Sequence, residues 1–190
     1  KQIISKNIDE GTPLHILINN SGGPKGGPII DADISEFNTT FQRHLVCNHI
    51  LAQALVPGMK SAGYGRIINI ISTSVKEPIK GLGVSNTIRG AVASWAKTLS
   101  AEISEFGITV NNILPGFTDT ERLSSLIKSK AAASGNSEQE IADGMLAQIP
   151  AGRFGKPEET AKAIAFLSSP AAGYINGVSL AVDGGRLSCI

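Results

Sequence analysis

The sequence predicts a doubly wound α/β fold built around a parallel sheet. Its apolar runs are nearly continuous rather than alternating, which is typical of parallel strands that helices cover on both faces. Segments with apolar side chains at helical spacing separate these runs. The resulting order is strand, helix, strand, helix, strand, helical insert, helix, strand, and it predicts right-handed helical crossovers. With 190 residues, 42% of them hydrophobic, the chain is sized for a single domain with a packed core.

Four runs rich in β-branched residues predict the strands, because such side chains favour the extended backbone. Each run is short and is bounded by glycine, proline or polar residues, as strands in α/β folds are. The predicted strands are residues 14–18, 66–71, 108–114 and 178–182.

Two long helices are predicted between the first three strands. The first covers residues 35–61, and Asp33 and Glu36 are expected to form a capping box at its start. The second covers residues 84–106 and stops at Gly107, a residue suited to the left-handed conformation that ends many helices.

The last part of the chain predicts a helical insert and one further helix. The insert spans residues 119–148 and has a probable break at Gly135-Asn136. The further helix begins after Pro157 and ends before Pro170. Acidic residues follow Pro157 directly, and they suit the positive end of the helix dipole.

Composition and charge exclude several functional classes. The net charge is +1 and no long basic run occurs, so the electrostatic signature of a nucleic-acid binder is missing. No apolar stretch reaches the roughly 20 residues that a membrane span needs, so no membrane partner is expected. Cys47 and Cys189 have no metal-binding or redox spacing, and we expect two free thiols in a reducing, cytoplasmic compartment.

Polar and glycine-rich motifs follow each predicted strand. In open α/β sheets ligands bind at the carboxyl ends of the strands. Taken singly, each motif is a common turn signal, but their shared position predicts a binding site. The motifs are Asn19-Asn20-Ser21-Gly22, Ser72, Pro115-Gly116-Phe117-Thr118-Asp119-Thr120 and Val182-Asp183-Gly184-Gly185.

These motifs resemble the short-chain dehydrogenase/reductase family along essentially the whole chain. Residues 17–22 resemble its "VNNAG" motif, residues 65–72 its "GRIVNISS" strand and residues 107–116 its "GIRVNAVAPG" segment. Residues 153–159 and 174–177 resemble two later markers of the family. The resemblance implies a Rossmann-type doubly wound parallel sheet and an NAD- or NADP-dependent oxidoreductase acting on a carbonyl or alcohol, most similar to reductases of the 3-oxoacyl-thioester type.

Part of the family pattern has no counterpart in these 190 residues. The phosphate-binding "TGxxxGIG" turn is missing, and the stretch from Gly22 to Gly27 is better interpreted as the loop after the "NNAG" motif than as a phosphate cradle. An apolar strand at 14–18 is expected to have neighbours, since an exposed edge invites aggregation. We therefore expect the first strands to precede residue 1, and the family resemblance implies a protein of about 260–280 residues.

The family's catalytic serine, tyrosine, lysine and asparagine are only partly matched. Ser72 stands at the serine position. Ser85 replaces the tyrosine, Arg89 replaces the lysine, and His44 stands at the asparagine position of the preceding helix. A serine hydroxyl is a far weaker acid than a phenol, and an arginine stays charged and cannot cycle a proton.

Two functional hypotheses therefore remain open. In the first, the protein is an oxidoreductase in which Ser72 orients the substrate oxygen and Arg89 holds a ribose. The proton is transferred by His44, or by water through Ser85. In the second, the chain is a nucleotide-binding or structural homologue that has lost the chemistry. The other histidines, His15 and His49, are expected to be structural.

The resemblance also implies a cofactor site, a lid and an assembly. The insert at 119–148 is expected to be a substrate lid for a small molecule. A homodimer or homotetramer is expected through residues 35–61, 84–106 and 178–182. The expected cofactor-binding residues are Asn20, Ser21, Gly22, Ile70, Arg89, Pro115, Gly116, Phe117, Thr118 and Thr120.

Overall fold

The computed structural model describes residues 14–189 and contains a four-stranded parallel sheet. The strands lie side by side in chain order, and every neighbouring pair is parallel. The α/β fold class predicted from the sequence is therefore confirmed. The strands are β1 (Ile16–Asn19), β2 (Gly65–Ile70), β3 (Ile108–Pro115) and β4 (Ser179–Val182).

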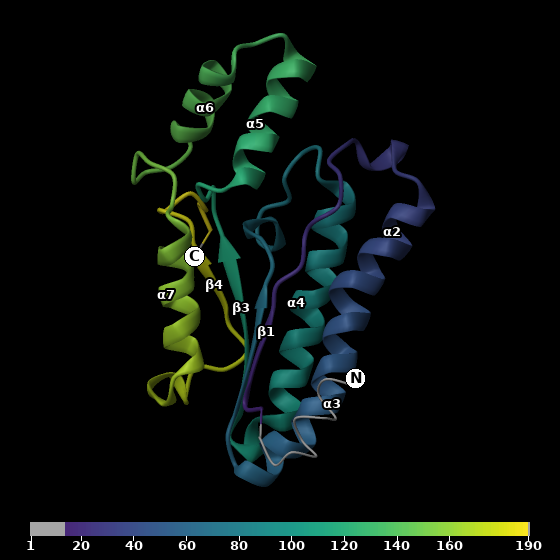
Figure 1. Cartoon of the computed structure of the whole chain (residues 1–190), viewed down its shortest axis with the longest axis vertical. Helices are drawn as coiled ribbons and strands as arrows, with labels where there is room; N and C mark the ends of the chain where they lie inside the picture. Colours follow the sequence, from purple (N-terminus) through teal and green to yellow (C-terminus); the bar gives the residue numbers. More distant parts are fainter. Residues whose placement is uncertain (1–13, 190) are drawn as a thin grey trace.

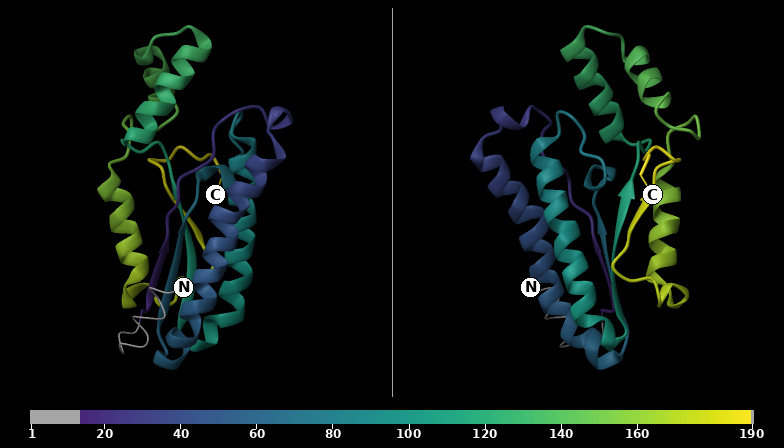
Figure 2. Two further views of the ribbon diagram at one scale, coloured as in Figure 1. Left: turned by 45° about the vertical axis from the view of Figure 1, so that its right-hand side comes forward. Right: turned by 180° about the vertical axis from the view of Figure 1, so that it is seen from behind.

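Helices cover both faces of this sheet (Figure 1). One face carries α3 (Cys47–Ala62) and α4 (Gly83–Ile103), and the other carries α7 (Pro157–Ser168). The insert forms α5 (Glu121–Ser134) and α6 (Glu138–Leu146), which project beyond the carboxyl ends of the strands in every view (Figure 2). Gly135, with a φ of 75°, ends α5 at the predicted break.

The first predicted helix is divided by a π-helical turn. It consists of α2 (Ile34–Phe41), a π turn over Gln42–Val46, and then α3. The expected capping box at its start is wrong. The Asp33 carboxylate accepts from the Ser35 amide at 2.7 Å, one residue too early for the reciprocal bond with Glu36.

The second predicted helix ends as expected. A 3₁₀ turn over Ser104–Phe106 follows α4, and Gly107 then takes the left-handed conformation with a φ of 73°. A Cβ at Gly107 would collide with the Gly63 carbonyl oxygen, so both backbone conformation and space require glycine there.

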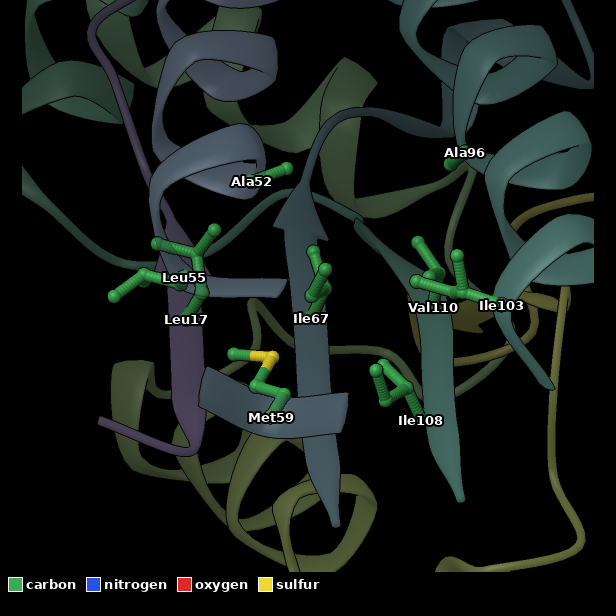
Figure 3. Close-up of a cluster of buried hydrophobic side chains, with 9 residues drawn as sticks. All are labelled: Leu17, Ala52, Leu55, Met59, Ile67, Ala96, Ile103, Ile108 and Val110. Atoms are coloured by element: carbon green, nitrogen blue, oxygen red, sulfur yellow. The ribbon is translucent and has the colours of Figure 1, made fainter. Parts of the chain in front are cut away.

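The main core lies between the sheet and the α3–α4 layer (Figure 3). Side chains from β1, β2 and β3 meet side chains from α3, α4 and their ends, and none is more than 8% exposed. The nine residues are Leu17, Ala52, Leu55, Met59, Ile67, Ala96, Ile103, Ile108 and Val110. A second cluster, which includes Ile68, Ile113 and Leu167, packs α7 onto the opposite face.

Strand β1 is covered on one face only by the described part of the chain. Leu17 and Asn19 are buried, whereas Ile16 and Ile18 are each 47% exposed. The prediction of a strand apolar on both faces is therefore corrected in two ways: the strand begins at Ile16, and α7 covers β2 and β3 rather than the outer face of β1.

A ladder of polar side chains crosses the sheet inside the core. Asn19 donates to Asn69 at 2.8 Å, Asn69 donates to Asn112 at 2.9 Å, and Asn112 donates to Ser179 at 3.1 Å. The four residues are direct partners in the strand register. Because a slip of one residue would leave these buried amides unpaired, the ladder specifies the register of all four strands.

Within residues 14–189, no helix is both long and apolar enough to cross a bilayer.

Candidate active site

The loop after β1 is held in place by His44. The His44 ring comes from the π turn and is 3% exposed. Its Nδ1 lies 3.0 Å from Ser21 Oγ, and its Nε2 lies 3.1 Å from the Gly22 carbonyl oxygen. A carbonyl only accepts, so Nε2 carries the hydrogen and Nδ1 accepts from the Ser21 hydroxyl. Such π turns are frequent at functional sites, and here the turn aims an imidazole at the loop.

The environment of His44 favours its neutral form. Burial is the main cause that lowers its pKa from 6.5, and the positive charge of Arg89 lowers it further. Both ring nitrogens are occupied by the loop after β1. The geometry therefore indicates that His44 positions this loop through its contacts with Ser21 and Gly22.

A pH-dependent stability follows from this lowered pKa. The unfolded chain binds a proton at His44 more readily than the folded one, so the free energy of unfolding is expected to fall as the pH drops below 6.5. In His44→Gln this part of the acid sensitivity should disappear. Urea titrations at several pH values measure it, with the exposed His49→Gln as the control. Equal acid sensitivity in wild type and His44→Gln would contradict the assignment.

Ser72 lies two residues beyond the end of β2, where the sequence places the family's serine. Its Oγ accepts a hydrogen bond of 3.1 Å from the Ser74 amide and caps the short turn Thr73–Val75. This is the local backbone bond expected of any strand-end serine. The hydroxyl hydrogen stays available, so Ser72 can still donate to a substrate oxygen.

Ser85 and Arg89 lie in the first two turns of α4 and are both 8% exposed. Arg89 Nε donates to Ser85 Oγ at 3.1 Å, and Arg89 Nη1 donates to the carbonyls of Ile70 at 3.2 Å and Ile71 at 2.7 Å. One guanidinium thus joins Ser85 to the strand end that carries Ser72. Burial, and after it the charge of Arg122, lowers the pKa of Arg89 to about 10, so Arg89 remains a cation at neutral pH.

The loop from Pro115 to Thr120 leaves β3 beside this cluster. Its two threonine hydroxyls donate to backbone carbonyls within the loop, both at 3.2 Å. A Cβ on Gly116 would lie 2.7 Å from the Asp183 Cα, so glycine is needed here for packing against the segment after β4. The Phe117 ring packs edge-to-face on Phe154, under the Arg186 guanidinium.

Arg122 is the residue at this site that sequence reasoning missed. It lies in the first turn of α5, and its Nη2 is 2.8 Å from the point where a Cβ on Gly23 would stand. In the sequence Arg122 is one charged residue among several on a helix. Only the path of α5 over the loop after β1 brings it to the site.

The predicted site residues thus fall into two groups. The structure directly joins Ser21, Gly22 and His44, and separately joins Ser85, Arg89 and Ile70 at the end of β2. Gly23 connects the groups, because a Cβ there would also be 3.4 Å from Arg89 Nη2. Asn20 and Gly22 are exposed, and open space surrounds the Cβ position of Gly22.

Comparisons with known proteins identify relatives of this chain. The family model described as enoyl-(acyl carrier protein) reductase matches residues 1–186. The 3-oxoacyl-[acyl-carrier-protein] reductase FabG of Vibrio cholerae is 35% identical over 179 residues, which cover 93% of this chain and 68% of the Vibrio protein.

Solved structures include relatives as well. YwfH, an NADPH-dependent reductase involved in bacilysin biosynthesis, has a TM-score of 0.93 and 30% identity, covering 100% of this chain and 73% of YwfH. L-sorbose reductase from Gluconobacter frateurii, solved with NADPH and L-sorbose, has a TM-score of 0.90 and 28% identity, covering 99% of this chain and 72% of that chain. Motifs, fold and relatives together show that this chain belongs to the short-chain dehydrogenase/reductase family, with relatives of the 3-oxoacyl reductase type.

Proposed function

We propose that the protein is an NAD(P)-dependent oxidoreductase that acts on a carbonyl or alcohol, similar to 3-oxoacyl-thioester reductases. The observation that carries the proposal is the junction made by Arg89. Its guanidinium binds Ser85 and the end of β2 next to Ser72, and its Nη2 faces the loop after β1 at Gly23. The relatives named above include reductases that use NADPH, and this favours NADP over NAD.

The residues present fit the nicotinamide end of such a cofactor. The space beside Gly22 is open, and no acceptor within residues 14–189 engages Arg89 Nη2, which leaves two cationic N–H donors, one of which is proposed to serve a ribose hydroxyl. The remaining contacts are proposed to come from the end of β2 and from the segments that follow β1 and end β3: Ile70, Asn20, Ser21, Gly22, Pro115, Gly116, Phe117, Thr118 and Thr120.

The chemistry divides between the cofactor and four side chains. When bound, a reduced nicotinamide would supply the hydride for the carbonyl carbon. Ser72 donates a hydrogen bond to the carbonyl oxygen and orients it. Ser85 passes a proton from water to that oxygen, while Arg89 holds the Ser85 hydroxyl at 3.1 Å. His44 keeps the loop after β1 in place, and the α5–α6 insert is proposed as the lid.

The second candidate is a homologue that binds nucleotide without turnover. The observation in its favour is the Ser85–Arg89 hydrogen bond. Ser85 Oγ already accepts from Arg89 Nε, and no phenol stands at this position. A panel of ketones and thioesters with NADPH separates the two candidates, because the second predicts cofactor binding with no oxidation of NADPH.

Arg89→Ala is expected to weaken NADPH binding at least ten-fold, because it removes a buried charge-assisted donor. Isothermal titration calorimetry on the full-length protein measures this. Arg89→Lys keeps the charge and guards against a folding defect, and it should lie between wild type and alanine. Lys97→Ala, an exposed cation on the same helix, is the control. Unchanged affinity in Arg89→Ala would remove Arg89 from the site.

Assembly into a homodimer or homotetramer is also proposed. In the described part of the chain β4 has no outer neighbour, and its Leu180 is 39% exposed. On the helical face Phe41 is 40% exposed. Light scattering at micromolar concentration should therefore give a multiple of the chain mass. A monomer would contradict this proposal.

A further inference from the structure

Two arginines from different parts of the fold converge at the loop after β1. Arg122 belongs to the insert and Arg89 to α4. A single point, the Cβ position of Gly23, lies 2.8 Å from Arg122 Nη2 and 3.4 Å from Arg89 Nη2. The two guanidinium groups are therefore close enough for one carboxylate or phosphate group to bind both.

No acidic side chain among residues 14–189 compensates these two charges. Within residues 14–189, the ion pair that forms is Arg153–Glu159, and neither Arg89 nor Arg122 has a carboxylate within 4.0 Å. Burial, and after it the charge of Arg122, lowers the pKa of Arg89. Burial is also the main cause that lowers the pKa of His44, and the charges of Arg89, Arg43 and Arg122 lower it further. Cations gathered without a partner are costly, and a bound anion relieves that cost.

The two arginines are also arranged to receive a ligand. Arg89 is fixed by three hydrogen bonds through Nε and Nη1, which leaves Nη2 directed toward Gly23. Arg122 is exposed, so an incoming molecule can reach it. Glycine at position 23 is needed, because a Cβ would occupy the place of the Arg122 guanidinium. One rigid donor and one accessible donor suit a planar acid group.

We propose that Arg89 and Arg122 form an anion site that holds the carboxylate or phosphate group of the carbonyl substrate. The inference rests on the proposed function and specifies its substrate class: a carbonyl compound that carries an acid group.

The test compares an acid with its neutral ester on the full-length protein. Levulinate and methyl levulinate share a ketone and differ in one negative charge. We expect wild type to bind levulinate about ten-fold or more tightly than the ester, in calorimetry without cofactor and again with saturating NADPH. Arg122→Gln should reduce this preference about ten-fold. Lys128→Gln, an exposed cation on the same helix, should retain it.

Three results would overturn the proposal. The first is equal affinity of wild type for acid and ester. The second is a preference that survives Arg122→Gln. The third is a loss of NADPH affinity in Arg122→Gln with the acid preference intact, which would assign the anion to a cofactor phosphate. If NADPH itself does not bind, the proposed function fails, while the cofactor-free titration still decides the anion site.

Discussion

Carbonyl reduction by the wild-type protein is expected to be slower than in short-chain reductases that keep tyrosine and lysine, by about 10²–10⁴-fold. That factor is the usual contribution of general acid–base catalysis. Ser85 offers a hydroxyl of unsuitable pKa, and Arg89 engages it at 3.1 Å. Because Ser72 and the strand-end loops are proposed to position the carbonyl and the nicotinamide, the loss should appear in kcat more than in NADPH affinity.

Restoring the missing groups tests this directly. The double variant Ser85→Tyr with Arg89→Lys is expected to raise kcat by at least ten-fold. The new phenol would serve as the proton donor, and the new lysine would place a compact cation beside it. Ser94→Tyr, on the exposed side of the same helix, controls for an added phenol ring. Brisk turnover by wild type would show that another group donates the proton. No turnover by wild type or the double variant, with NADPH still bound, would favour the non-catalytic homologue.

Asn69→Ala is expected to destabilise the protein by about 2–5 kcal/mol. Asn69 is completely buried and holds the centre of the ladder. Its removal leaves Asn19 Nδ2 without an acceptor and Asn112 Oδ1 without a donor, and it opens a cavity between strands. Each of these losses lowers the free energy of unfolding on its own, so the total effect should be large for a single side chain.

Urea unfolding followed by circular dichroism measures the effect of Asn69→Ala. The matched control is Asn38→Ala, an exposed asparagine on α2 that makes no side-chain hydrogen bond within the described chain. It should change the free energy of unfolding by less than about 0.5 kcal/mol. A similar, small effect in both variants would show that the ladder does not contribute to stability.

Much of the fold is visible in the sequence because each local signal agrees with the global arrangement. The strand predictions miss their true ends by at most two residues, and both Gly107 and Gly135 end helices in the left-handed conformation. Two of the three ladder asparagines, Asn69 and Asn112, stand inside predicted strands, and Asn19 directly follows another. Their pairing became evident only from the strand register, which a sequence pattern does not define.

The site could be predicted in part. Ser85 and Arg89 are i, i+4 neighbours on a helix, so their contact follows from spacing. The π turn that brings His44 to Ser21 carries no recognisable sequence signal. The approach of Arg122 to Gly23 depends on how the insert crosses a loop distant in the chain, and side-chain type alone does not indicate it.

The measurement that tests the central claim most directly is NADPH binding and NADPH oxidation by the full-length protein, with and without Arg89, on a panel of ketones and thioesters. The account predicts saturable NADPH binding that weakens at least ten-fold in Arg89→Ala, together with slow, substrate-dependent NADPH oxidation. The account would be contradicted if correctly folded wild-type protein bound neither NADPH nor NADH.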